Sequence, residues 1–416
     1  MKDRKRIALE MESLSIYKGI LKRTVPGALY RLLWAADGPE REFAAAWSAL
    51  FAALCERECS DNLAGCVTEA ALYDENAFSL AAAAGRTDFP PCVRNAVKRD
   101  LGVIRDAAFL TPEQILAGSS CAECAGQLDL PLWKTGEPVG ALRGDIDACV
   151  RRMEEYYRAN GCGMFARYRA FIWRDSRIRP VGYPDPVSLT DLKGYDEQRN
   201  LAIGNTAAFL DGLPANNCLL YGDRGTGKSS TVKAILNRFY TRGLRMIEMP
   251  KESLSDFPLL VDAIAPLPMK FIIFIDDLSF SVQNDAYASL KAVLEGGLAA
   301  RPDNTLIYAT SNRRHLVRET FSDRAGDEVH RGDSMQESLS LADRFGLSIR
   351  FSLPDRDAFL EIVRRLAAQR GIKDHLEELE EGAERWAIAR GGRSPRCAKQ
   401  YVRYAEACIR SGQPLR

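Results

Sequence analysis

The sequence predicts an α/β protein built on a doubly wound parallel sheet, with helical regions before and after the sheet. Five short apolar runs lie between residues 217 and 351, and helical segments separate most of them. Such runs are typical of strands that are buried on both faces of a parallel sheet. The flanking regions repeat apolar residues at helical spacing instead. With 416 residues the chain is too long for one compact core, which predicts two or three domains.

The first part, residues 1–180, is predicted to be a mostly helical domain that recognises a partner, because it carries no catalytic signature. Thr111-Pro-Glu-Gln is typical of a helix start, with a threonine cap and proline in the first turn. Phe43 to Cys55, the longest uncharged apolar stretch, is too short to cross a bilayer and indicates a buried helix. Apolar residues recur at helical spacing at Ile7, Leu9, Leu14, Ile16, Tyr17, Ile20 and Leu21, and at Val139, Leu142, Ile146, Val150, Met153 and Tyr157.

The eleven cysteines are expected to be free, buried thiols, since a long chain without an export signal needs no disulfide framework. The alternative is a structural zinc site that joins Cys121 and Cys124, a CxxC pair, to Cys55 and Cys59. A second CxxC is missing and the three histidines lie far downstream. Core thiols are therefore preferred to zinc.

The net charge of +1 provides no overall field that attracts nucleic acid or an anionic membrane, although a local basic patch remains open. The N-terminus starts with basic residues, but Glu10 and Glu12 interrupt any apolar signal core. We therefore expect a cytoplasmic protein that does not associate with a membrane.

Pro180 to Pro186 contains three prolines and a glycine and is predicted to be a linker. The sheet domain is expected at residues 188–353 and a small helical subdomain at 354–416. The predicted strands are Asn217–Tyr221, Arg245–Met249, Lys270–Ile275, Asn304–Ala309 and Leu347–Phe351, and the predicted C-terminal helices are Asp355–Leu366, Asp374–Ile388 and Pro395–Ile409.

A phosphate-binding loop is predicted between the first of these strands and a helix over Ser229–Arg242. Its glycines let backbone N–H groups approach phosphate oxygens, and the helix N-terminus adds donors and a favourable dipole. Lys228 would reach the β- and γ-phosphates of a nucleotide, and the Ser229 hydroxyl would coordinate Mg²⁺. The predicted nucleotide-binding residues are Gly222, Asp223, Arg224, Gly225, Thr226, Gly227, Lys228, Ser229 and Ser230.

Two carboxylates, Asp276 and Asp277, follow the most apolar predicted strand. Ligands of open α/β sheets bind at the carboxyl ends of the strands, where these side chains would lie. Asp276 is placed to hold Mg²⁺ through water, and Asp277 to orient an attacking water. The alternative is that the pair only caps the following turn.

Three further polar residues fit the same chemistry. Asn312 ends a strand expected beside that of Asp276 and would position the water near the γ-phosphate. Arg344 precedes the last strand and is expected to point into the site of a neighbouring subunit. Arg396 opens a helix, where a cation opposes the helix dipole unless it faces a phosphate. Surface arginines and a strand-end turn are the alternatives.

Together these residues resemble the AAA+ ATPases, over about residues 188–412. The resemblance implies a P-loop NTPase fold with a C-terminal helical lid, ATP and Mg²⁺ as cofactors, and a homo-oligomer. It implies that Gly194 and Tyr195, in a box before the phosphate loop, line the adenine pocket. It also assigns Walker A to Gly222–Ser229, Walker B to Asp276 and Asp277, sensor 1 to Asn312, the arginine finger to Arg344, and sensor 2 to Arg396, with Arg393 as the second choice.

Within the AAA+ proteins, the chain resembles a bacterial group of ATP-binding proteins that is described as a domain of unknown function. The shared phrases are Ser311 to Arg318 and the later Asp-Arg-Phe-Gly around Arg344. The group brings no known substrate.

One residue departs from the family pattern, because most AAA+ proteins have glutamate where this chain has Asp277. Bacterial replication initiators also carry Asp-Asp, so slow hydrolysis is expected. The preferred function is an ATPase that remodels or loads an unknown protein or nucleic-acid partner. The alternative is a nucleotide-dependent switch or adaptor with little turnover. A metabolic kinase is disfavoured by the lid, and the lack of an obvious pore-loop aromatic between Met249 and Pro268 favours loading over unfolding.

Overall fold

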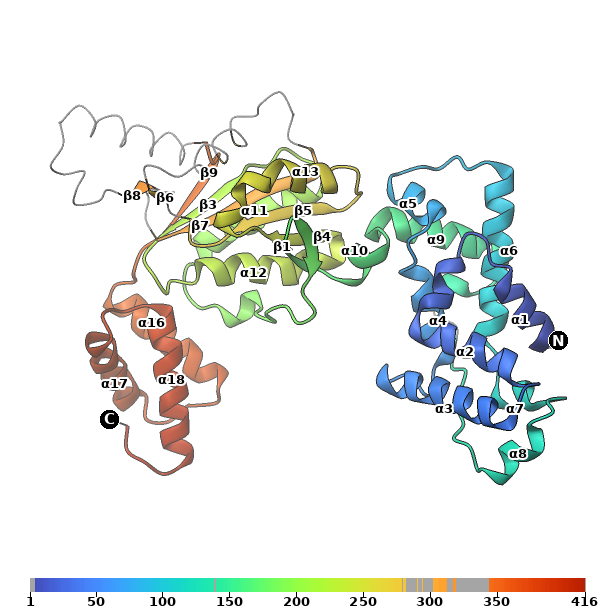
Figure 1. The fold of residues 1–416 in the computed structure, drawn as a ribbon. Helices are drawn as coiled ribbons and strands as arrows, with labels where there is room; N and C mark the ends of the chain where they lie inside the picture. Colours follow the sequence, from blue (N-terminus) through green and yellow to red (C-terminus); the bar gives the residue numbers. More distant parts are fainter. Residues whose placement is uncertain are drawn as a thin grey trace. The chain divides into compact units, whose positions relative to one another are not determined.

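The computed structural model describes residues 4–137, 140–278, 280–281, 290, 294, 302–312, 317–318 and 344–415. The chain divides into two compact units, Met1–Arg167 and Tyr168–Arg416 (Figure 1). Each unit is described by itself.

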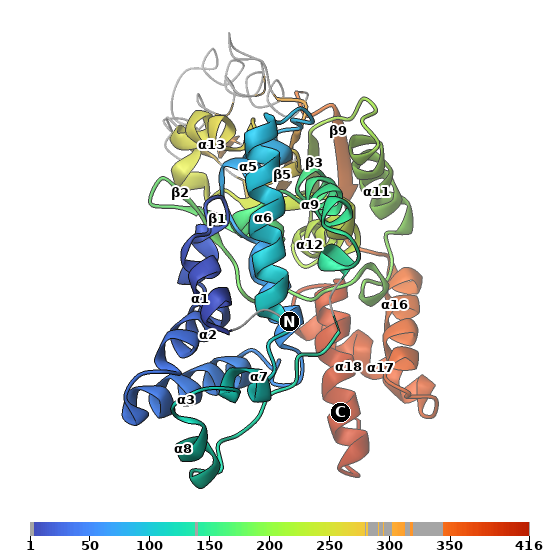
Figure 2. The ribbon, with the colours of Figure 1, turned by 90° about the vertical axis from the view of Figure 1, so that its right-hand side faces the viewer.

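The described residues of the first unit form helices and connecting segments. Helix α6 contacts α1, α4 and α9, and Figure 2 shows α6 with α1 on one side and α9 on the other. The core contains Trp47 and Trp133, whose ring centroids lie 4.8 Å apart. The α-helices are α1 (Arg4–Glu12), α2 (Thr24–Ala35), α3 (Glu40–Glu56), α4 (Leu63–Leu72), α5 (Ala77–Ala83), α6 (Pro91–Ala108), α7 (Pro112–Leu116), α8 (Ala122–Gln127), α9 (Ile146–Asn160) and α10 (Gly163–Arg167), with 3-10 turns at Lys18–Lys22 and Gly140–Leu142.

Two local helix signals of this unit are confirmed. Thr111 Oγ1 accepts from the backbone N–H of Gln114, and Gln114 Oε1 accepts from the N–H of Thr111, so α7 begins with a capping box. The apolar stretch Phe43–Cys55 lies in α3, which buries Phe43, Trp47 and Leu50. The apolar series from Ile7 to Leu21 is instead divided between α1, which ends at Glu12, and the 3-10 turn at Lys18–Lys22, and Val139 lies outside the described residues. In the described part of the chain, no helix is long and apolar enough to cross a membrane.

The expectation that all cysteines are free, buried thiols is wrong at four positions and only partly met at Cys124, which is half-buried. Cys59 and Cys66 form a disulfide, and Cys55 and Cys92 are exposed free thiols. Cys59 and Cys66 lie seven residues apart, on the two sides of the turn that leads into α4, which brings their side chains together. Among the described residues no three His, Cys, Asp or Glu side chains form a group that could hold a metal ion.

In the second unit, seven described strands form one sheet in the order β2-β1-β4-β5-β7-β3-β9. All neighbouring strands are parallel except β1 and β2. This is the predicted α/β doubly wound parallel sheet. The strands are β1 (Ala170–Arg174), β2 (Arg177–Pro180), β3 (Cys218–Gly222), β4 (Leu244–Glu248), β5 (Lys270–Ile275), β7 (Thr305–Ser311) and β9 (Leu347–Phe351); β6 (Phe280–Ser281) and β8 (Val317–Arg318) pair separately.

The five predicted apolar runs are all strands of this sheet, but the sheet begins earlier in the chain than the expected boundary at residue 180. Strand β1 pairs in parallel with β4, and Ala170 lies opposite Met246. Phe171 and Trp173 are buried and alternate with less buried residues, as in a strand with one face on the core. Asp175 and Ser176, both with positive φ, form the two-residue turn into β2. Residues 170–180 therefore belong to the second unit and not to the helical N-terminal part.

Both faces of the sheet are buried. Cys218, Leu220 and Ile272 share one core cluster with side chains of α11 and α12, while the alternate residues Leu219 and Ile273 are buried on the opposite face. The helices of this region are α11 (Asp196–Leu210), α12 (Lys228–Phe239) and α13 (Phe257–Ile264), with 3-10 turns at Leu189–Asp191, Tyr240–Arg242 and Lys251–Asp256.

After β9 the chain forms three helices that pack on one another: α16 (Arg356–Gln369), α17 (Leu376–Ala389) and α18 (Pro395–Arg410) (Figure 1). They have a core of their own, which includes Phe359, Val363, Leu379 and Tyr401. The Asp355 carboxylate caps α16 by accepting from the N–H of Ala358 at 2.8 Å. The predicted C-terminal helical lid is thus present.

Candidate functional site

The phosphate-binding loop joins the end of β3 to the start of α12. Gly222, Gly225 and Gly227 have positive φ angles of 129°, 77° and 95°. A Cβ at Gly222 would lie 2.2 Å from the carbonyl oxygen of Phe351, so no larger residue fits there. The loop therefore turns sharply into the N-terminus of α12, whose free N–H groups favour an anion.

Lys228 lies at the first turn of α12 and is 6% exposed. Its Nζ donates to the carbonyl oxygens of Gly222 at 2.9 Å and Asp223 at 2.7 Å, and to Asn312 Oδ1 at 3.2 Å. Burial lowers the pKa of the ammonium group, and the nearby carboxylates, Asp223 foremost, oppose that shift. The three donors of Lys228 are thus held by oxygens that a phosphate can replace.

The two carboxylates lie directly after β5, beside the phosphate loop. Ser229 Oγ donates to Asp276 Oδ1 at 2.6 Å, and Asn312 Nδ2 donates to Asp277 Oδ1 at 2.6 Å. Asp277 has a positive φ of 49°, a left-handed conformation that aspartate tolerates better than most residues. Because β7 lies between β5 and β3, the sheet places Asn312 between the acidic pair and Lys228.

Thr310 connects the two carboxylate residues, and the sequence analysis missed it. Its Oγ1 accepts from the N–H of Asp277 at 3.0 Å and donates to Asp276 Oδ1. The side chain is 2% exposed, in a strand that is buried along its whole length. A polar residue two positions before Asn312 shares its face of the strand, and that spacing was the available signal.

The cavity above the loop has a volume of about 580 Å³, within the usual range for ligand sites. Apolar side chains line one end of it: Leu192, Tyr195, Phe351, Ile362 and Leu366. The Tyr195 hydroxyl donates to the carbonyl oxygen of Ser352 at 2.6 Å, and its ring lies 5.2 Å from that of Phe351.

Three of the predicted nucleotide-binding residues, Gly194, Gly222 and Asp223, are not in the described cavity lining. The carbonyl oxygens of Gly222 and Asp223 accept from Lys228 Nζ. A Cβ at Gly194 would lie 2.9 Å from Ile362, so this glycine allows the box before the phosphate loop to approach α16 closely.

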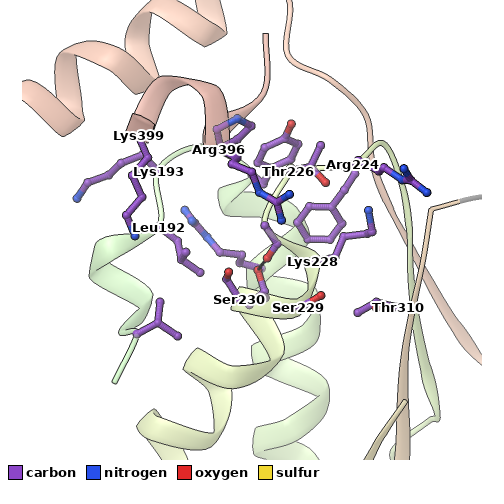
Figure 3. A pocket seen from close by; sticks show the side chains of 18 of the residues that line it. Leu192, Lys193, Arg224, Thr226, Lys228, Ser229, Ser230, Thr310, Arg396 and Lys399 are labelled. Carbon is purple, nitrogen blue, oxygen red and sulfur yellow. Dashed lines mark hydrogen bonds between the residues drawn. The ribbon is translucent and has the colours of Figure 1, made fainter. Parts of the chain in front are cut away.

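The lid contributes basic side chains to the same cavity. Arg396 lines it, and the N–H of Arg396 donates to the carbonyl oxygen of Gly225 at 3.1 Å. Arg393, the second choice for this role, instead donates to Glu384 at 2.8 Å. Figure 3 shows Arg396 and Lys399 on α18, and Lys193 lines the same cavity. The sequence analysis did not single out Lys193 or Lys399.

Arg344 does not line the described cavity. It precedes Leu347 at the amino end of β9, whereas Phe351 at the carboxyl end of that strand lines the cavity. The sequence before Arg344 is rich in both charges and predicts a charged loop, but its residues Glu319, Asp323, Arg324, Asp327 and Glu328 lie outside the described part of the chain. The side chain of Arg318 and residues 313–316 of the shared phrase also lie outside it.

A protein family described as "Protein of unknown function (DUF815)" matches residues 166–408. The chain belongs to this family. The match begins beside the boundary between the two units and includes the sheet, the phosphate loop, both carboxylates and the lid. The expected AAA+ resemblance and the P-loop fold with a helical lid are confirmed.

The DUF815 chain is also similar to the Holliday junction branch migration complex subunit RuvB of Dehalococcoides mccartyi, with 27% identity over 241 residues. The alignment covers 55% of this chain and 60% of RuvB, less than two thirds of the relative's length. Among solved structures, the RuvB Holliday junction branch migration motor of Thermotoga maritima aligns over 56% of this chain and 68% of that one, with a TM-score of 0.39 and 16% identity. A single-substitution variant of the same protein aligns with a TM-score of 0.39 and 17% identity.

Proposed function

We propose that this protein binds ATP with Mg²⁺ in the cavity between the sheet and the lid and hydrolyses it slowly. The observation that carries the proposal is one connected set of side chains at the carboxyl ends of β5 and β7. Lys228, Ser229, Asp276, Asp277 and Asn312 are joined there by hydrogen bonds of 2.6 to 3.2 Å, and the N–H of Asp277 provides the link to Asp276. Each has the functional group that phosphoryl transfer to water requires.

The donor set fits a magnesium ion. Ser229 Oγ and Asp276 Oδ1 lie 2.6 Å apart, and hydroxyl, carboxylate and water oxygens are the ligands that Mg²⁺ takes at nucleotide sites. When bound, the ion neutralises charge on the β- and γ-phosphates. Lys228 and the N–H groups of the loop bind the same phosphates from the other side.

We assign the water-positioning role to Asp277 and Asn312. Asp277 is exposed toward the cavity, and its carboxylate accepts from Asn312, whose Oδ1 in turn accepts from Lys228. A water held by the carboxylate would thus lie close to the phosphate that Lys228 binds. Arg396 faces the cavity from the lid and supplies a further positive charge.

ATP turnover would drive remodelling or loading of a protein or nucleic-acid partner, which the helical unit before residue 167 would recognise. The similarity to a Holliday junction branch migration subunit makes DNA the first partner to test. We propose a cytoplasmic homo-oligomer with a core over residues 188–353, which the strands at 170–180 extend, and a lid over 354–416.

The second candidate function is a nucleotide-dependent switch with little turnover. It is favoured by Asp277, because an aspartate in the left-handed conformation replaces the longer glutamate of most AAA+ proteins. Steady-state phosphate release, measured with and without DNA or cell extract, separates the two. Turnover that stays below one ATP per hour under every condition would favour the switch.

Asp277→Asn is expected to keep Mg·ATP affinity and lower the turnover by about 10²-fold or more, because the variant loses the carboxylate that orients water. Asp276→Ala is expected to weaken ATP binding in Mg²⁺ but not in EDTA. Calorimetry with a non-hydrolysable analogue and a phosphate-release assay measure both effects. Equal loss of affinity in the two variants would contradict this division of roles.

Thr310→Val is expected to lower turnover by about tenfold while ATP affinity changes less than twofold. The valine leaves the N–H of Asp277 with only the 3.2 Å bond to Asp276 Oδ1 and removes the hydroxyl that donates to Asp276. The lost hydrogen bonds cost about 1–3 kcal/mol in the positioned state. Thr310→Ser keeps the hydroxyl and should restore most of the turnover. Wild-type turnover in the valine variant together with slow turnover in the serine variant would show that Thr310 acts only through packing.

A further inference from the structure

The connector between the sheet and the lid is held by the nucleotide site itself. Phe351 ends β9, and α16 begins at Arg356. Between them, the carbonyl oxygen of Ser352 accepts from the Tyr195 hydroxyl, and the N–H of Leu353 donates to Asp223 Oδ2 at 2.7 Å. The connector is thus bound both by Tyr195, before the phosphate loop, and by Asp223 of the loop itself.

Asp223 makes this second attachment with both its backbone and its side chain. Its N–H donates to the carbonyl oxygen of Phe351 at 2.9 Å, while its carboxylate holds Leu353 two residues further along the connector. Its own carbonyl oxygen accepts from Lys228 Nζ at 2.7 Å. One residue therefore joins the phosphate-binding lysine to the hinge of the lid.

The position of this carboxylate also explains why an anion-binding loop tolerates it. An aspartate that pointed at the phosphates would repel them. Asp223 instead points to the connector, and it is not among the described residues that line the cavity. Binding to the Leu353 N–H directs the carboxylate at the connector, although it stays near enough to Lys228 to raise the pKa of that ammonium group more than Asp276 or Asp277 does.

We propose that Asp223 is a positioning residue that transmits occupation of the phosphate site to the lid. This inference rests on the proposed nucleotide binding. A bound phosphate competes with the carbonyl oxygens of Gly222 and Asp223 for Lys228 Nζ, so binding changes the restraint on the Asp223 peptide. Because the same residue holds Phe351 and Leu353, the connector and the lid respond to that change.

The phosphate loop also contacts the lid directly, in addition to its connection through Asp223. The N–H of Arg396 donates to the carbonyl oxygen of Gly225 at 3.1 Å, and a Cβ at Gly225 would lie 3.0 Å from Ser394 Oγ. The Asp223 connection differs from it because it acts on the hinge, which sets the orientation of all three lid helices.

Hydrogen exchange of the full-length protein tests the proposal, since the Leu353 amide is itself the donor. Three proteins are compared: the wild type, Asp223→Ala, which removes the acceptor, and Asp223→Asn, which keeps an acceptor oxygen but removes the charge. Each is measured without nucleotide and with Mg²⁺ and a non-hydrolysable ATP analogue at ten times that protein's own Kd.

Without nucleotide, the Leu353 amide is expected to exchange about tenfold faster in Asp223→Ala than in the wild type, and near the wild-type rate in Asp223→Asn. With the analogue, exchange in α16, α17 and α18 should slow in the wild type and in Asp223→Asn but not in Asp223→Ala. Residues 222–230 should be protected by the analogue in all three proteins.

Two results would overturn the inference alone: an unchanged Leu353 rate in Asp223→Ala, or full slowing of lid exchange in that variant. An asparagine variant that behaves like alanine would assign the effect to charge and would also overturn it. If the analogue fails to protect residues 222–230 in the wild type, the proposed function fails and the coupling fails with it.

Discussion

Lys228→Ala is expected to weaken binding of Mg·ATP by about 10- to 100-fold and to reduce turnover to background. A hydrogen bond to a charged group contributes about 1.5–3 kcal/mol, and each 1.4 kcal/mol changes affinity about tenfold. In the structure Lys228 Nζ already points to the oxygens around the phosphate loop. A bound triphosphate can therefore interact with the positive charge of Lys228 without a rearrangement of that side chain. Calorimetry and phosphate release measure the two effects.

The matched control is Lys233→Ala, on the same helix but not among the described residues that line the cavity. This control should bind ATP like the wild type. Both variants should retain the helical circular dichroism signal of the wild type, because neither removes an apolar core side chain. Unchanged nucleotide affinity in Lys228→Ala would rule out this loop as the phosphate site.

The sequence predicts the phosphate end of the site well because short-range chemistry determines it. A Cβ has no room at Gly222, and the motif spacing places Lys228 and Ser229 in the first turn of α12. The proximity of Asp276 and Asn312 required one further assumption, that their strands are neighbours. The structure confirms this assumption, because β5 pairs with β7.

The roles of Thr310 and Asp223 were not predicted, because they depend on contacts between residues that are distant in the sequence. The hydroxyl of Thr310 meets the N–H of Asp277 across two strands, and the carboxylate of Asp223 meets Leu353, 130 residues away in the chain. Neither pair has a sequence spacing that predicts it. The β1–β2 hairpin did have a signal, a two-residue turn at Asp175 and Ser176, which was hidden by the helical pattern before it.

Arg344 is expected to act on the nucleotide of a neighbouring subunit. In its own subunit it lies at the amino end of β9, and the five residues of that strand alone span about 13 Å toward the cavity, at ~3.3 Å per residue. The described cavity lining does not include it. A role in catalysis therefore requires a second copy of the chain, which also agrees with the resemblance to AAA+ proteins.

Arg344→Ala should bind ATP almost normally but hydrolyse it roughly 10³-fold more slowly, the scale of an arginine finger supplied in trans. The matched control is Arg350→Ala, an exposed arginine on the same strand that does not line the described cavity. Its turnover should stay within about twofold of the wild type. For the wild type, turnover per subunit should rise with protein concentration, because the finger and the site meet only on assembly.

Mixing variants gives the most demanding form of this prediction. Arg344→Ala keeps an intact nucleotide site, and Lys228→Ala keeps an intact arginine, so a mixture of the two inactive proteins should recover part of the activity. Recovery should depend on the ratio of the two and disappear on dilution. If neither mixing nor concentration changes the rate per subunit, and the monomer is fully active in size-exclusion fractions, Arg344 is a structural arginine at the amino edge of the sheet. The proposed assembly would then be wrong as well, because nothing else in the site requires a second subunit.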